Sequence, residues 1–212
     1  MTKIEQIQNA IEKALRRESK LTPLALSIPM LGSLNIRHLL NNLASISSVF
    51  AENGSHVGGS FCSAIFRNYN LKQAIAIDSW ASDVTEGNNY ETQFRDNVAI
   101  IDDGRIPITV IKSDSFAVDV NVLPKIDFYY FDGSHDYESQ RKALTYYLPA
   151  MADEFLFAVD DYMLQEVKQG TQDGIKESGC EILFERVFET NSEYDNESFW
   201  RSWYVAFLKK KA

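Results

Sequence analysis

The sequence predicts an α/β protein with a doubly wound, mostly parallel sheet covered by helices on both faces. Short, almost wholly apolar segments rich in aromatic and β-branched residues alternate with amphipathic segments along residues 47–177. Such apolar runs are typical of strands buried on both faces, and strand–helix alternation is typical of parallel sheets. The last two strand-like segments follow one another without a helix, which predicts an antiparallel pair at one edge.

Composition restricts the function. The chain has 212 residues, enough for one domain with a real core, and its formal net charge of -9 argues against sequence-independent nucleic-acid binding. The apolar run 21–31 is too short to span a membrane and is broken by prolines. Cys62 and Cys180 are isolated, as in reduced cytoplasmic proteins. We therefore expect a cytoplasmic protein without nucleic-acid or membrane partners.

Residues 1–46 are predicted to be a helical extension. Ile4, Ile7, Ile11 and Leu15 recur at helical spacing, and residues 35–46 repeat this pattern after a proline-broken connector. Because this segment precedes the first strand, we expect it to lie outside the sheet and to form a lid over the site.

Residues 47–212 are predicted to form the remaining single globular unit. Its expected strands are 47–52, 73–78, 107–113, 126–132 and 154–160. Its expected helices are 59–68, 88–101, 136–148 and 162–177, and residues 114–123 fit either a short helix or a loop. Residues 180–190 and 198–210, joined by 191–197, are expected to form the C-terminal antiparallel β-hairpin, which brings the sheet to seven strands.

An acid stands at the end of five successive predicted strands: Glu52, Asp78, Asp114, Asp132 and Asp160. Any one of them is better explained by the preference of Asp for turns and helix N-caps. Five such acids in one sheet instead indicate a ligand site, because ligands of parallel sheets bind beyond the carboxyl ends of the strands.

The segment ENGSHVGGS, residues 52–60, connects the first predicted strand to a helix. Glycines at such a turn let the backbone approach a ligand. Their spacing differs from the dinucleotide pattern G-x-G-x-x-G, and a Walker lysine is missing. An NAD-dependent oxidoreductase and an ATP site are therefore disfavoured.

These motifs, with AIDSW, KSDS, FDGSHDYES and AVDDY, resemble the class I S-adenosylmethionine-dependent methyltransferases. The similarity covers about residues 47–162 and is closest to the family-24 type found among small-molecule and sugar O-methyltransferases. It implies a Rossmann-like fold whose last strands are antiparallel. The cofactor-binding residues that it implies are Glu52, Gly54 and Ser55 at the methionine end, Gly58, Gly59 and Ser60 closing the turn, Asp78 with Trp80 nearby at the ribose, Asp114 and Ser115 at the adenine, and Asp132.

Two histidines have open assignments. His56 either contacts the carboxylate of the cofactor or faces solvent in its loop. His135 is the nearest candidate for a general base, because relatives with well-defined metal sites have an acid where this chain has Ser134. His135 could instead orient the cofactor or cap the following helix.

The resemblance also implies a divalent cation held by Asp132, Asp160 and Asp161. Three hard oxygen ligands favour Mg²⁺ or Mn²⁺ over zinc. The alternative is that Asp160 and Asp161 are N-caps of the following helix.

The expected function is methyl transfer to a hydroxyl of a small molecule or sugar, with Asp132 and His135 at the reacting end. The departure at Ser134 leaves a non-catalytic or regulatory S-adenosylmethionine-binding protein as the alternative. The C-terminal aromatics are expected either to fill a half-buried hairpin or to form a homodimer surface; they are Phe199, Trp200, Trp203, Tyr204 and Phe207.

Overall fold

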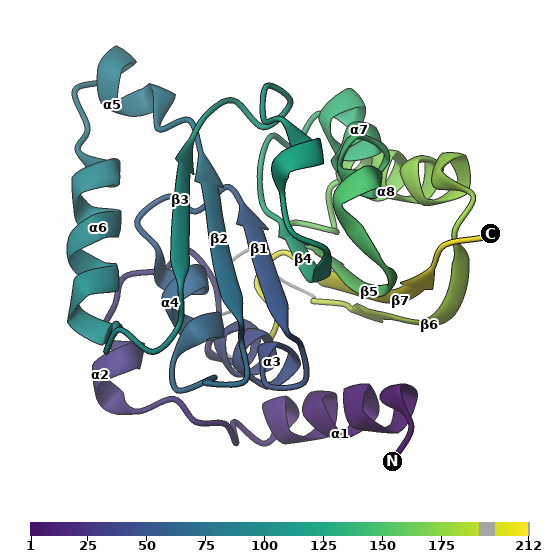
Figure 1. Ribbon diagram of the computed structural model, residues 1–212, viewed down its shortest axis with the longest axis horizontal. Helices are drawn as coiled ribbons and strands as arrows, with labels where there is room; N and C mark the ends of the chain where they lie inside the picture. Colours follow the sequence, from purple (N-terminus) through teal and green to yellow (C-terminus); the bar gives the residue numbers. More distant parts are fainter. Residues whose placement is uncertain (191–197, 212) are drawn as a thin grey trace.

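A computed structural model describes residues 1–190 and 198–211 of the chain. Within these residues seven strands form one sheet in the order β3-β2-β1-β4-β5-β7-β6 (Figure 1). The strands are β1 (Val49–Asn53), β2 (Gln73–Asp78), β3 (Ile108–Lys112), β4 (Ile126–Phe131), β5 (Met151–Val159), β6 (Glu181–Phe188) and β7 (Trp203–Lys209). The predicted doubly wound α/β sheet is confirmed.

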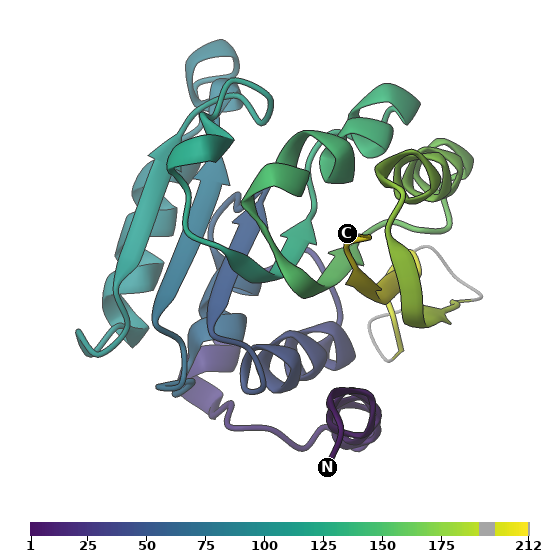
Figure 2. The same cartoon turned by 45° about the vertical axis from the view of Figure 1, so that its right-hand side comes forward.

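Helices cover both faces of the sheet (Figures 1 and 2). The α-helices are α1 (Lys3–Leu15), α2 (Pro23–Leu26), α3 (Leu34–Ala44), α4 (Gly59–Ile65), α5 (Ala81–Thr85), α6 (Tyr90–Ile101), α7 (Tyr137–Tyr147) and α8 (Gln165–Ser178). Two short 3₁₀ helices, η1 (Val120–Val122) and η2 (Leu148–Ala150), precede β4 and β5 respectively. Among these helices, none that the structure describes is long and apolar enough to cross a bilayer.

The pairing of the strands brings their functional ends together. β1 pairs in parallel with β2 and β4, and the outer pairs β2–β3 and β4–β5 are also parallel. The carboxyl ends of these five strands therefore meet at one edge of the sheet. β7 lies antiparallel between β5 and β6, so the predicted C-terminal pair is present, with β6 as the edge strand. Its predicted connection, 191–197, lies outside the described residues.

Alternating side chains of each strand fill two hydrophobic cores. Phe50 and Phe128 pack with α1, α3, α4 and α6 on one face. Ala51 and Tyr129 pack with α7 and α8 on the other face. This period of two on strands with both faces covered explains why the sequence runs are apolar without interruption. Most of the C-terminal aromatics belong to the same interior; Phe199, Trp203, Tyr204 and Phe207 are each at most 4% exposed.

The N-terminal extension is built into the first core. Ile7 and Ile11 of α1 are fully buried and belong to the same cluster as the strand residues. Helix α3 is buried along its whole length between α1 and α4. The connector between α2 and α3 brings Met30 and Leu31 to the carboxyl edge of the sheet, so a lid function, which stays a prediction, concerns this connector.

Candidate active site

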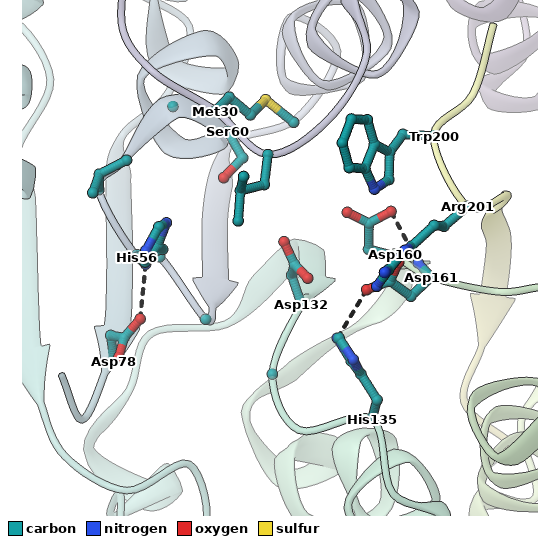
Figure 3. A pocket seen from close by; sticks show the side chains of 16 residues that line it. Met30, His56, Ser60, Asp78, Asp132, His135, Asp160, Asp161, Trp200 and Arg201 are labelled. Atoms are coloured by element: carbon teal, nitrogen blue, oxygen red, sulfur yellow. Dashed lines mark hydrogen bonds and ion pairs between the residues drawn. The ribbon is translucent and has the colours of Figure 1, made fainter. Parts of the chain in front are cut away.

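A cavity of about 370 Å³ opens at the carboxyl ends of β1, β2, β4 and β5. This volume is typical of small-molecule sites, which are roughly 300–1,000 Å³. Figure 3 shows its side chains in three groups, with Asp132 in the middle. The lining residues are Met30, Leu31, Gly54, Ser55, His56, Val57, Gly59, Ser60, Asp78, Asp132, Gly133, His135, Asp160, Asp161, Trp200 and Arg201.

The glycine-rich turn forms the near wall of the cavity. Gly54 follows β1 with φ of 92°, and a Cβ there would lie 1.9 Å from the carbonyl oxygen of Asp132. A Cβ on Gly59, the first residue of α4, would lie 2.2 Å from the carbonyl oxygen of Pro29. The two glycines thus let the ends of β1 and β4 and the N-terminal connector approach one another closely.

We expect Gly54→Ala to lower the free energy of unfolding by about 2–4 kcal/mol, because the new methyl group meets rigid backbone at a left-handed position. Gly104→Ala is the matched control. Gly104 also has a positive φ, 76°, but nothing lies within 4 Å of the added Cβ. We therefore expect this variant to lose only about 1 kcal/mol of the free energy of unfolding. Urea denaturation of both variants measures the difference, and equal losses would contradict the packing argument.

Asp78 ends β2 and organises one end of the cavity. Its two carboxylate oxygens accept hydrogen bonds from the backbone N–H groups of His56 and Trp80, both at 2.8 Å. The indole of Trp80 in turn donates to the carbonyl oxygen of His56 at 2.8 Å. Each carboxylate oxygen retains a lone pair for a further donor such as a hydroxyl. The imidazole of His56 lines the cavity and contacts the ring of Tyr90 edge-on.

Glu52 of β1 is an unusual buried acid beside this wall. Its side chain is fully buried, and neither carboxylate oxygen has a hydrogen bond of good geometry among the described residues, although the hydroxyls of Ser60 and Ser55 lie nearby. Burial raises the pKa of Glu52 to about 8; the hydroxyls of Ser60 and Ser55 oppose this shift, whereas the charges of Asp78 and Asp160 add to it. The hydroxyl of Ser55, which lines the cavity, also lacks a partner in the described part of the chain.

The middle of the cavity is formed by two carboxylates linked by a tyrosine. The hydroxyl of Tyr130, in β4, lies 3.3 Å from Asp132 Oδ2 and 3.0 Å from Asp160 Oδ2. One hydroxyl proton serves one carboxylate at a time. Burial and the neighbouring charges of Asp160 and Asp161 raise the pKa of Asp132 well above its usual range. Burial, followed by the charge of Asp161, raises the pKa of Asp160 to about 7.

His135 and Asp161 form the opposite end of the cavity. The imidazole Nε2 lies 2.9 Å from Asp161 Oδ2, and this hydrogen bond raises the pKa of His135. A guanidinium nitrogen of Arg201 lies 3.6 Å from the other oxygen of Asp161. Ligand atoms of Asp132, His135 and Asp161 lie within 4.8 Å of one another, a spacing that could hold a metal ion. Asp160 instead turns its oxygens to Tyr130 and to the backbone N–H of Asp161.

Not every predicted site residue lines the cavity. Glu52, Gly58 and Trp80 lie next to lining residues, behind the wall. Asp114 is exposed and accepts from the backbone N–H of Phe116, and the hydroxyl of Ser115 donates to the Asn53 side chain. Their expected contact with an adenine stays a prediction.

Sequence reasoning missed several residues of the site. Tyr130 lies within an apolar strand, and the sequence pattern around it does not distinguish it from a core residue. Met30, Leu31 and Arg201 belong to connections, and no periodicity marks them. Trp200 was expected in a half-buried hairpin or a homodimer surface, but it lines the cavity.

Comparison with known proteins agrees with this arrangement. A family model described as a methyltransferase domain matches residues 51–162, more than half of the chain. No curated protein sequence matches significantly.

Solved structures with the same fold cover nearly the whole chain. The O-methyltransferase TomG from Streptomyces achromogenes, involved in tomaymycin synthesis and solved with S-adenosylmethionine, is 13% identical, with a TM-score of 0.61 over 97% of this chain and 90% of that one. An O-methyltransferase from Bacillus cereus, in complex with S-adenosylhomocysteine, is 11% identical, with a TM-score of 0.60 over 99% and 93%. A methyltransferase from Podospora anserina, also bound to S-adenosylhomocysteine, is 9% identical, with a TM-score of 0.62 over 98% and 88%. At these identities the likeness shows a shared fold.

Proposed function

The chain belongs to the class I S-adenosylmethionine-dependent methyltransferases, and on this premise we propose that it methylates a hydroxyl group of a small molecule. The observation that carries the proposal is that the two ends of the cavity of about 370 Å³ carry different groups. Asp78 and the glycine-rich turn lie at one end, and a histidine–carboxylate cluster lies at the other. A methyl donor bound at the first end would present its reactive group toward the second.

The residues at the first end fit the cofactor. The carboxylate of Glu52 and the hydroxyl of Ser55 lack hydrogen bonds of good geometry within the described residues, so a positively charged ligand that donates hydrogen bonds would stabilise this part of the wall. The α-ammonium group of S-adenosylmethionine is such a partner. Asp78, with lone pairs remaining on both oxygens, suits the ribose hydroxyls. Bound S-adenosylmethionine supplies a methyl group that an acceptor oxygen takes as the carbon–sulfur bond breaks.

His135 is proposed to receive the proton of the acceptor hydroxyl. The carboxylate of Asp161, 2.9 Å from Nε2, stabilises the imidazolium that proton uptake creates and holds the ring in position. Ser134, which replaces an acid of the relatives, donates to Asp136 Oδ2 at 2.6 Å and does not line the cavity. The base is therefore assigned to the next residue along the chain.

A divalent cation at this cluster is the alternative to the proton-accepting role of His135. Asp132, Asp161 and His135 would hold it, and it would polarise the acceptor hydroxyl as a Lewis acid. One imidazole beside two carboxylates favours Mn²⁺ over Mg²⁺. We expect Mn²⁺ to raise the melting temperature of the protein more than Mg²⁺ at equal concentration, and Asp161→Asn to remove most of this difference. Equal shifts for the two cations would contradict the mixed ligand set.

The proposed function is tested by calorimetric titration with S-adenosylhomocysteine, followed by transfer of labelled methyl from S-adenosylmethionine to a panel of hydroxyl compounds. We expect binding and transfer. Binding without transfer to any phenol, alcohol or sugar would favour the non-catalytic alternative. Loss of transfer in chelator with recovery in Mn²⁺ would assign His135 to the cation rather than to the proton.

A further inference from the structure

One wall of the cavity is not explained by the cofactor. Trp200 and Arg201 lie beside Asp160 and Asp161, away from the end formed by Asp78 and His56 (Figure 3). Met30 and Leu31 of the N-terminal connector complete this wall. Three of the four side chains of this wall, those of Met30, Leu31 and Trp200, are apolar, although the same cavity contains Asp132, Asp160 and Asp161. Leu31 is 69% exposed, so most of its side chain is accessible to a ligand.

The two segments that form this wall are fastened to each other. The hydroxyl of Ser33 donates to the carbonyl oxygen of Ser198 at 2.6 Å, across 165 positions of sequence. Next to it, the buried ring of Phe199 stacks on Phe188 of β6 with centroids 4.3 Å apart. The wall is therefore held by a hydrogen bond and an aromatic anchor.

The backbone that carries Trp200 is also fixed on its other side. The carbonyl oxygen of Arg201 accepts from the N–H of Met163 at 2.9 Å, and that of Ser202 accepts from Tyr162 at 3.1 Å. Arg201 and Ser202 both have left-handed φ angles, 49° and 64°. Two successive non-glycine residues in this region are strained, and such strain persists where surrounding contacts enforce it, often at functional sites.

We propose that Trp200, Met30 and Leu31 form an acceptor subsite for a planar, unsaturated ring, with the hydroxyl to be methylated directed at Asp132 and His135. This inference rests on the proposed function and narrows its acceptor to phenol-type hydroxyls. A flat ring buries its apolar faces against such a wall, whereas the hydroxyls of a sugar would lose hydrogen bonds there.

Methyl transfer to a ring hydroxyl held on this wall changes two bonds to carbon. The O–C bond forms as the C–S bond breaks, the phenolic proton passes to His135, and the thioether product is neutral.

Catechol and cis-cyclohexane-1,2-diol are matched probes, since both carry two adjacent hydroxyls on a six-membered ring and only one ring is planar. Trp80 and Trp203 are at most 2% exposed, whereas Trp200, the remaining tryptophan, is half-buried in the cavity wall. We expect catechol, added to the S-adenosylhomocysteine complex, to quench tryptophan fluorescence, and Trp200→Phe to abolish the quenching. The saturated diol should quench little.

Calorimetry supplies the affinities. We expect Trp200→Ala to weaken catechol binding about 10–100-fold. Leu31→Ser, a change at an exposed position that should alter the free energy of unfolding little, is expected to weaken it several-fold. Binding of S-adenosylhomocysteine should stay unchanged in both variants. Equal affinity of the two rings, or catechol binding unaffected by both variants, would overturn the subsite even with methyl transfer intact. Trp200-dependent binding of catechol without any methyl transfer would support the subsite and overturn the proposed O-methylation.

Discussion

Glu52→Gln is expected to weaken S-adenosylhomocysteine binding roughly 10–100-fold while making the free protein more stable above pH 8. The two effects have one cause. The buried carboxylate lacks hydrogen bonds of good geometry among the described residues, so its charge is costly until a cation arrives. Glutamine keeps the shape and removes the charge.

The pH dependence follows from the raised pKa of Glu52, about 8 against an ordinary 4.5. The native state then binds this proton more tightly than the unfolded state, so the stability of the free protein falls as pH rises from about 4.5 to 8. Above pH 8 the full cost is on the order of 2–5 kcal/mol. Ligand affinity should change in the opposite direction, rising with pH up to about 8, because the ligand's ammonium group pairs with the carboxylate form.

Thermal unfolding at pH 5 and pH 9, with and without S-adenosylhomocysteine, measures both effects. Without ligand, the melting temperature of the Gln variant should equal that of the wild type at pH 5 and exceed it at pH 9. With S-adenosylhomocysteine bound, this advantage at pH 9 should disappear. Glu181→Gln, which alters an exposed acid on β6, is the control and should change neither quantity. A Gln variant that is less stable than the wild type at pH 9 would show that Glu52 already has a partner in the free protein.

His135→Ala is expected to lower kcat by about 10²–10⁴-fold, the usual contribution of a general base, and to leave S-adenosylhomocysteine affinity within a few-fold. The side chain lies at the far end of the cavity from Asp78, and it contacts Asp161 rather than the glycine-rich turn. Single-turnover kinetics with the best acceptor of the panel, combined with calorimetry, separate the two parameters.

A second histidine of the cavity provides the matched control for His135. The contacts of His56 with Asp78 and Trp80 are made by its backbone, so His56→Ala should raise the KM for S-adenosylmethionine a few-fold and change kcat little. Added imidazole should partly restore His135→Ala if the ring takes a proton. Recovery with excess Mn²⁺ but not with imidazole would argue that the ring is a ligand instead.

The sheet was largely predictable because its signal is local. Strands covered on both faces need uninterrupted apolar runs, and those ending in Asp132 and Asp160 stand out. Helices α2 and α5, of four and five residues, are too short to show a helical period and were not predicted. The segment left as helix or loop, 114–123, contains the single 3₁₀ turn η1.

Only those site residues that stand at the carboxyl ends of the parallel strands could be predicted from the sequence. Acids at strand ends must meet at one edge, which explains Asp78, Asp132 and Asp160. Trp200 reaches the same cavity because β7 begins beside the carboxyl end of β5, and because the left-handed residues Arg201 and Ser202 turn the chain between Trp200 and β7. Such an approach depends on tertiary contacts such as that between Ser33 and Ser198, which no sequence period reports.

A crystal structure of the protein with S-adenosylhomocysteine tests the central claim most directly. The account predicts the ribose at Asp78, the amino acid end beside Ser55 and Glu52, and the sulfur directed toward Asp132, with Trp200 facing open space for an acceptor. Ligand density anywhere else, for example in the cavity of about 270 Å³ near Tyr69 and Arg105, would contradict it.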